Sequence, residues 1–180
     1  MSEITDQSGT RILRPFEYEK LITSIPKLEN KTKFKMLLFS GMRYAEGVHL
    51  YKHPQLFTGD GIKMPSSKTK ATQKERWIIL TPEARTTVEY YLHGDGLPHI
   101  VNWDSDLKRW ADLAGIGSKG MSSKTTRKTW ESWLVCSDKN SLKVCVSQGH
   151  TQITALQYYI TLPFTDEDKV SIARYTKDWK

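Results

Sequence analysis

The sequence is poor in the residues on which secreted proteins and metalloenzymes depend. It holds two cysteines, Cys136 and Cys145, and five histidines in 180 residues. Two cysteines in such a chain indicate reduced structural thiols rather than a disulfide framework or a zinc site. His49 and His53 are four residues apart, but no third ligand is near them in sequence. No metal ion is therefore expected.

Long apolar runs and the usual catalytic signatures are also missing. No stretch approaches the roughly 20 apolar residues that span a bilayer, and the N-terminus MSEITDQSGTRILRPF lacks a signal-peptide pattern. The chain has no glycine-rich phosphate loop, no GxSxG elbow, no HExxH motif and no acidic cluster for two-metal nuclease chemistry. We expect a protein without a membrane partner, located in the cytoplasm.

Positive charge is what the chain has in excess. Its net charge is +7, and lysine and arginine cluster at 61–76 and 118–128, interleaved with serine and threonine. Such clusters suit phosphate contacts, although either one alone also fits a solvated basic face. Because there are two, nucleic acid is the favoured partner. A hydrophobic content of 38% with six tryptophans indicates one domain with a proper core.

The local patterns predict an α+β, mainly helical fold with one small antiparallel sheet. Its two strands lie within 56–64 and 75–80 and flank a polar connection. Asn30, Thr81 and either Asp104 or Ser105 are the expected N-caps of three helices, and Gly149 is an expected helix stop. Helices are expected at about 15–25, 31–40, 42–52, 82–93, 106–116, 122–136 and 138–148, with a last one that starts in TDED, 165–168.

Four segments resemble the sequence boxes of tyrosine recombinases, the phage-type integrase family. GMRYAEGVHL (41–50) resembles the first arginine box, and KTTRKTWESWL (124–134) the second. GHTQITALQYYI (149–160) is similar to the Gly-His box that carries the nucleophile, and PSSKTK (65–70) resembles the hairpin with the catalytic lysine. Each box alone is a weak signal, but the family's order is kept. The resemblance covers about 40–160, essentially the whole catalytic domain.

The resemblance implies that Arg43 and Arg127 clamp the scissile phosphate and that Glu46 orients an arginine from behind. Lys124 stands at the first position of the second box, where many members have histidine. From the residues alone, Arg43 and Glu46 also fit an i,i+3 surface pair. Arg127, flanked by Lys124 and Lys128, also fits a solvated helix face.

The nucleophile is implied to be Tyr159, nine residues after His150, which would hydrogen-bond the phosphate. Attack by the tyrosine hydroxyl gives a 3′-phosphotyrosyl intermediate. On one uninterrupted helix, position +8 lies nearer the histidine than +9, so periodicity mildly favours Tyr158. The family spacing favours Tyr159, which requires a bend between the histidine and the tyrosine.

The general acid on the leaving 5′-oxygen is implied to be Lys68, because the surrounding Ser-Lys-Thr matches the family. Lys70 and Lys74 in the same hairpin compete for this role. Further residues are expected to contact DNA: Lys63, Lys70, Lys74, Arg76, Lys119, Ser123 and Lys128.

The resemblance implies site-specific DNA recombination, by integration or excision, on double-stranded DNA and without a cofactor. A homotetramer is expected on DNA, with a monomer or weak oligomer when the protein is free. Residues 1–180 are expected to form a single catalytic domain without the family's N-terminal core-binding domain. The tail at about 160–180 is expected to pack on a neighbouring subunit.

Within the family, Lys124 and the RKTW sequence resemble integrases of archaeal viruses and plasmids. Two alternatives stay open. One is a type IB topoisomerase-like enzyme, which shares the chemistry but relaxes DNA. The other is a non-catalytic DNA-binding module of the same fold.

Overall fold

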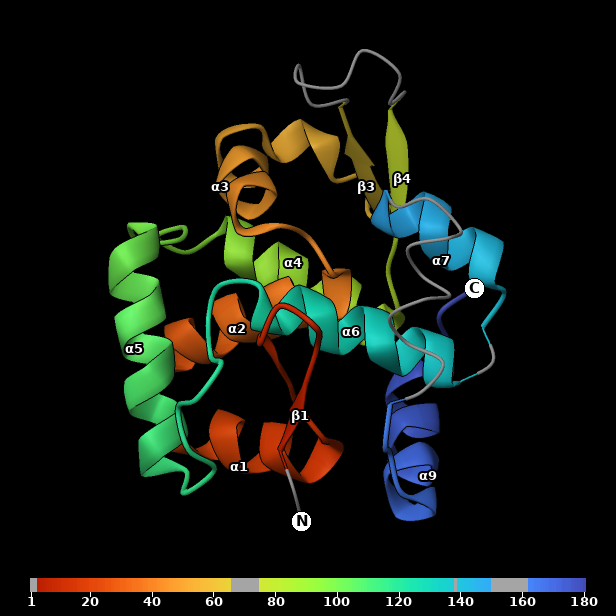
Figure 1. Cartoon of the computed structure of the whole chain (residues 1–180). Helices are drawn as coiled ribbons and strands as arrows, with labels where there is room; N and C mark the ends of the chain where they lie inside the picture. Colours follow the sequence, from red (N-terminus) through yellow and green to blue (C-terminus); the bar gives the residue numbers. More distant parts are fainter. Residues whose placement is uncertain (1–2, 66–74, 138, 150–161) are drawn as a thin grey trace.

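Figure 1 shows a computed structural model of the chain, which describes residues 3–65, 75–137, 139–149 and 162–180. These residues form an α+β, mainly helical fold, as predicted. The helices in chain order are α1 (Pro15–Ser24), α2 (Leu28–Ser40), α3 (Tyr44–Lys52), the 3-10 turn η1 (Pro54–Leu56), α4 (Pro82–Leu92), α5 (Ile100–Leu113), α6 (Thr125–Cys136), α7 (Ser141–Gln148) and α9 (Asp166–Thr176). No described helix is both long and apolar enough to cross a bilayer.

Helix α6 forms the centre of the core and is buried on several faces. Trp130, Trp133 and Leu134 are fully buried, and α6 packs against α2, α9 and the strand β2 (Arg11–Ile12) (Figure 1). Two hydrogen bonds fasten Leu13 to this helix: its amide donates to Thr129 Oγ1 at 3.0 Å, and its carbonyl accepts from Trp133 Nε1 at 2.9 Å. The buried backbone next to β2 thus finds its partners on α6.

The predicted antiparallel hairpin is present. Strands β3 (Gly61–Met64) and β4 (Arg76–Ile79) pair with Gly61 opposite Ile79 and Met64 opposite Arg76. Gly59, with φ +88°, supplies the left-handed residue of the turn before β3. β4 also packs against α7, so the base of the hairpin lies beside the end of that helix. A second sheet was not predicted: β1 (Ile4–Thr5) pairs with β2, and two-residue strands leave no periodicity to detect.

Most predicted helix ends are confirmed. Pro15 opens α1, Thr81 caps α4 by accepting from Ala84 N, and Thr165 caps α9. Helix α7 ends at Gly149, whose φ of +69° is left-handed.

Two N-cap predictions were wrong. Helix α2 begins at Leu28 with Lys27 as its N-cap, so Asn30 lies inside the first turn. Glu29, also in that first turn, forms an ion pair with Lys33.

Helix α5 begins at Ile100 with His99 as its N-cap, earlier than the predicted Asp104 or Ser105. The reason is tertiary: Trp103 is buried, so the helix extends to bring it into the core. Asp104 instead accepts the amide of Ser123 at 2.7 Å, and Ser105 Oγ donates to the Val101 carbonyl at 2.9 Å.

The C-terminal residues 162–180 pack on their own domain. Ile172 is fully buried, Asp168 pairs with Arg14, and the Tyr175 ring stacks on Trp133 at 5.2 Å. Trp179 is buried and its Nε1 donates to the Ile79 carbonyl at 3.1 Å. This describes the chain on its own; packing of the tail on a neighbouring subunit stays a prediction.

Candidate functional site

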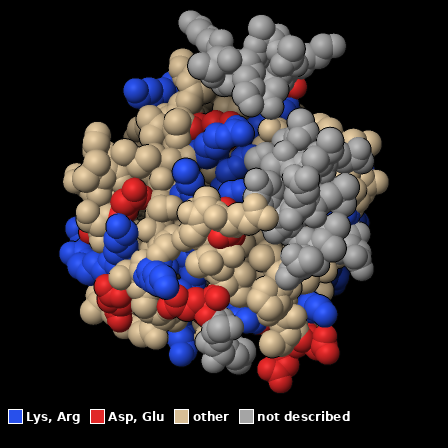
Figure 2. All heavy atoms as spheres, viewed as in Figure 1, with Lys and Arg blue, Asp and Glu red and all other residues tan. Residues whose placement is uncertain are grey.

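Residues from the two arginine boxes meet around one hollow. A depression of about 650 Å³ is lined by Arg43, Lys124, Arg127 and Lys128, with Tyr44 and Ser123 beside them. It lies between the start of α3, the start of α6 and the turn that joins β1 to β2. Figure 2 shows basic side chains gathered in the middle of this face of the molecule.

Arg43 presents a half-exposed guanidinium while Glu46 holds it. The residue is the N-cap of α3, and its amide donates to Glu46 Oε2 at 2.8 Å. Its Nη1 lies 3.0 Å from Glu46 Oε1, and 46% of the Arg43 side chain is exposed. The ion pair between residues i and i+3 is therefore the same contact through which Glu46 would orient Arg43.

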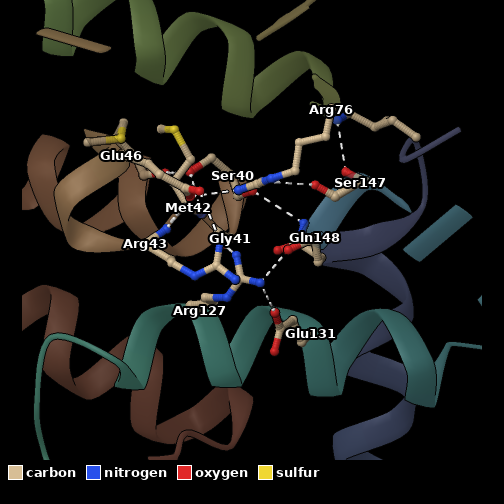
Figure 3. Close-up of polar contacts among 12 residues, drawn as sticks. Ser40, Gly41, Met42, Arg43, Glu46, Arg76, Arg127, Glu131, Ser147 and Gln148 are labelled. Carbon is tan, nitrogen blue, oxygen red and sulfur yellow. Dashed lines mark hydrogen bonds and ion pairs between the residues drawn. The ribbon is translucent and has the colours of Figure 1, made fainter. Parts of the chain in front are cut away.

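Arg127 is mostly buried, with 7% of its side chain exposed. Its Nη1 donates to the Gly41 carbonyl at 2.8 Å, its Nη2 donates to the Gln148 carbonyl, and it pairs with Glu131 Oε1 at 2.9 Å (Figure 3). Burial lowers the pKa of Arg127, and Glu131 opposes that shift. Arg127 therefore does not lie on a solvated helix face; it joins the ends of α2 and α7.

Gly41 makes this junction possible. It ends α2 in the left-handed region, with φ +62°, and a Cβ on it would collide with the side-chain amide of Gln148. The glycine of the first box is thus favoured by its left-handed conformation, and it leaves room for the Gln148 side chain. It directs the chain into Arg43 while its carbonyl accepts from Arg127.

The remaining basic residues divide between two hollows and the hairpin. Lys128 Nζ lies 3.6 Å from Asp6 Oδ2, next to the first hollow. Lys119 lines a second depression of about 460 Å³ together with Lys108. Lys63 lies on β3, is exposed and pairs with Glu75 at 3.1 Å, and it lines neither of these two hollows.

Arg76 differs from its expected place on the DNA-binding surface. Only 10% of its side chain is exposed, and Nη2 lies 2.6 Å from Glu46 Oε2 (Figure 3). Five predicted site residues lie outside the described residues: Lys68, Lys70, Lys74, His150 and Tyr159. Their roles stay predictions.

Sequence reasoning missed Asp6 and Lys108. Asp6 accepts from the amides of Ser8 and Thr10, at 2.8 and 2.9 Å, and so shapes the turn that walls the first hollow. Its Asp-x-Ser spacing is a turn signal that could have been read from the sequence. Lys108 carries no such signal, because only the packing of α5 brings it beside Lys119.

Neither a family model nor a curated protein matches the sequence. Among solved structures, the chain is similar to the crystal structure of XerA recombinase, with a TM-score of 0.66 and 16% identity. The match covers 91% of this chain and 64% of the XerA chain, so this chain spans less than two thirds of that protein's length. The likeness shows the fold: it is that of a tyrosine-recombinase catalytic domain.

Proposed function

We propose that the protein cleaves and rejoins double-stranded DNA through a phosphotyrosine and thereby carries out site-specific recombination. One observation carries the proposal: Arg43, Lys124 and Arg127, from two boxes far apart in sequence, line a single hollow. The fold shared with XerA recombinase supports it, because the two arginine boxes then lie on a fold that a recombinase also has. The net charge of +7 suits a polyanionic partner.

The proposed reaction uses side chains only. The Tyr159 hydroxyl gives its proton to His150 and its oxygen attacks the scissile phosphorus, the bond to the 5′-oxygen breaks, and Lys68 gives that oxygen a proton. Arg43 and Arg127 stabilise the negative charge on the non-bridging oxygens, with Lys124 and His150 assisting. Attack by a 5′-hydroxyl of a second strand reverses these steps. The phosphotyrosine conserves the energy of the broken linkage, so no cofactor takes part.

The proposal includes a homotetramer on DNA, in which residues 160–180 pack on a neighbouring subunit. For that exchange, α9 has to leave the α6 and α1 surfaces on which it packs in the single chain. The finer proposal of integration or excision for an archaeal virus or plasmid rests on Lys124 and the RKTW sequence.

The test is a covalent trapping assay in EDTA. Wild type, Tyr159→Phe and Tyr158→Phe are mixed with supercoiled plasmid that carries candidate attachment DNA and then quenched with SDS. Nuclease digestion and peptide mapping locate the tyrosine that bears a nucleotide. We expect an adduct on Tyr159, formed by wild type and Tyr158→Phe and lost in Tyr159→Phe.

The other outcomes decide between the alternatives. An adduct on Tyr158 would place the nucleophile one residue earlier. Relaxed plasmid with no strand exchange between two sites would indicate a topoisomerase-like activity. Binding of DNA without any adduct would contradict the proposal and indicate the non-catalytic module.

A further inference from the structure

We propose that Arg76 is a positioning residue for Arg43: it fixes the Glu46 carboxylate that in turn holds the Arg43 guanidinium at the hollow. This inference rests on the proposed function for its catalytic consequence. It assigns to Arg76 a role inside the protein in place of the expected contact with DNA.

The first argument is the bridge made by one carboxylate. Glu46 Oε2 lies 2.6 Å from Arg76 Nη2, and Oε1 lies 3.0 Å from Arg43 Nη1. The side chains of Glu46 and Arg76 are 18% and 10% exposed, whereas that of Arg43 is 46% exposed. The two inner members are thus shielded from water, and only the outer arginine faces the hollow. Charge-assisted hydrogen bonds of this kind are the strong ones.

The second argument is that Arg76 also lies against the end of α7. A Cβ on Gly149 would come within 3.0 Å of Arg76 Cδ and Nε, so the arginine side chain packs directly over this glycine. Arg76 Nη1 lies 3.5 Å from the Ser147 carbonyl, and Ser147 Oγ accepts the amide of Ile79 at 3.1 Å (Figure 3). One side chain therefore links β4, the start of α3 and the end of α7. In sequence these are the base of the lysine hairpin, the first arginine box and the Gly-His box.

The third argument concerns charge. Burial by itself raises the pKa of Glu46, but Arg76 is the strongest opposing influence and, with the Arg43 amide and the charge of Arg127, it brings the pKa below the ordinary value. In the part of the chain that the structure describes, the charged groups that face the carboxylate are Arg43 from the α3 N-cap, Arg76 from β4 and Arg127 from α6. Without Arg76 the burial is less opposed and the pKa of Glu46 rises. The carboxyl is then protonated at a higher pH, and a neutral carboxyl holds the Arg43 guanidinium less well.

The experiment compares Arg76→Met, Arg76→Lys and the control Arg85→Met. Arg85 also forms an arginine–carboxylate pair, with Asp60 at 2.8 Å, but that pair is exposed. DNA affinity is measured at several salt concentrations, and single-turnover formation of the covalent adduct is measured from pH 5 to 9. Melting curves show which variants are folded, and the ¹³C signal of the Glu46 carboxyl is titrated in each.

We expect Arg76→Met to form the adduct roughly 10–100-fold more slowly, the usual cost of removing a supporting partner. Its DNA affinity and salt slope should stay unchanged, and the acid limb of its pH profile should move to higher pH together with the Glu46 titration. Arg76→Lys keeps the positive charge with fewer donors and should recover part of the rate. Arg85→Met should match wild type in every measurement.

Two results would overturn the inference. One is weaker DNA binding with a salt slope reduced by about 1, which would make Arg76 a phosphate contact. The other is an unchanged Glu46 titration in Arg76→Met, or in the equally uncharged Arg76→Gln if the methionine variant does not fold. If the wild type forms no adduct at all, the proposed function fails, but the Glu46 titration still tests whether Arg76 holds this carboxylate.

Discussion

Arg127 shares its guanidinium among the Gly41 carbonyl, the Gln148 carbonyl and the Glu131 carboxylate. These partners make it a structural anchor as well as a candidate phosphate ligand. Arg76, from β4, contacts the first turn of α3 at Glu46 and the end of α7 at Ser147. Two arginines from different elements therefore connect the end of α7 with the end of α2 and the start of α3. At the residue scale, the site is organised by arginines that face inward.

Removal of Glu131 should show how much this anchor depends on its counter-charge. The Glu131 side chain is 1% exposed, so Glu131→Ala leaves a buried guanidinium without its carboxylate. We expect the free energy of unfolding to fall by about 3–5 kcal/mol, measured by urea denaturation. The control is Glu89→Ala on the surface of α4, which should change it by less than about 0.5 kcal/mol. An equally small loss at Glu131 would mean that Arg127 is held without this carboxylate.

At the scale of elements, α6 organises the molecule because it supplies both site residues and core. Lys124 is its N-cap and Arg127 lies in its first turn, while Trp130 and Trp133 anchor the next turns in the core. The candidate site residues therefore lie at the N-terminus of a helix whose position is determined by the packing of its tryptophans. The C-terminal residues close the other side of this helix, with Tyr175 stacked on Trp133.

Trp179 should contribute measurably to the free energy of unfolding through this packing. It is 2% exposed and donates to the Ile79 carbonyl at 3.1 Å, so it fastens the C-terminus to β4. Trp179→Ala should lower the free energy of unfolding by about 3–5 kcal/mol. Val170→Ala, at a position 57% exposed, is the matched control and should change little. The thermal midpoint of the free wild type should not vary with protein concentration; a rise with concentration would show that the free chains associate.

At the scale of the whole molecule, four lysines gather around two adjoining hollows. The hollows share Ser8 in their linings, and they are lined by Lys108, Lys119, Lys124 and Lys128. A basic track of this kind can follow a phosphate backbone beyond the cleaved position. The turn between β1 and β2 forms a wall of both hollows, so the N-terminal sheet contributes to the surface that DNA would meet.

The salt dependence of DNA binding tests this track. Lys119→Ala should weaken binding to any sequence and reduce the slope of log K against log salt by about 1. Lys169→Ala is the control, because that lysine lies on α9 and pairs with Asp166 at 3.1 Å. Affinities are measured by fluorescence anisotropy on a duplex between 50 and 200 mM salt, a range chosen because phosphate contacts respond strongly across it. Equal slopes for the two variants would place the DNA elsewhere on the molecule.

Prediction from sequence succeeded where the signal is local. The Pro15, Thr81 and Thr165 helix starts and the Gly149 stop are confirmed, because capping depends on a few neighbouring backbone groups. The fold class and the hairpin are confirmed as well. The start of α5 was wrong because burial of Trp103 outweighed the caps at Asp104 and Ser105. The two-residue strands β1 and β2 could not be predicted, because two residues show no alternation of apolar and polar side chains.

By itself the sequence determined most helix ends, although not the starts of α2 and α5, together with the excess of positive charge and the order of the four boxes. These features depend on neighbours along the chain. Only the tertiary structure decided that Arg127 is buried and donates to two carbonyls, and that Arg76 is mostly buried against the Glu46 carboxylate. The reason is physical. Whether a guanidinium faces water or the interior depends on which segments pack around it. Arg127 contacts Gly41 and Gln148, and Arg76 contacts Glu46. These partners lie on elements that meet only in the folded chain.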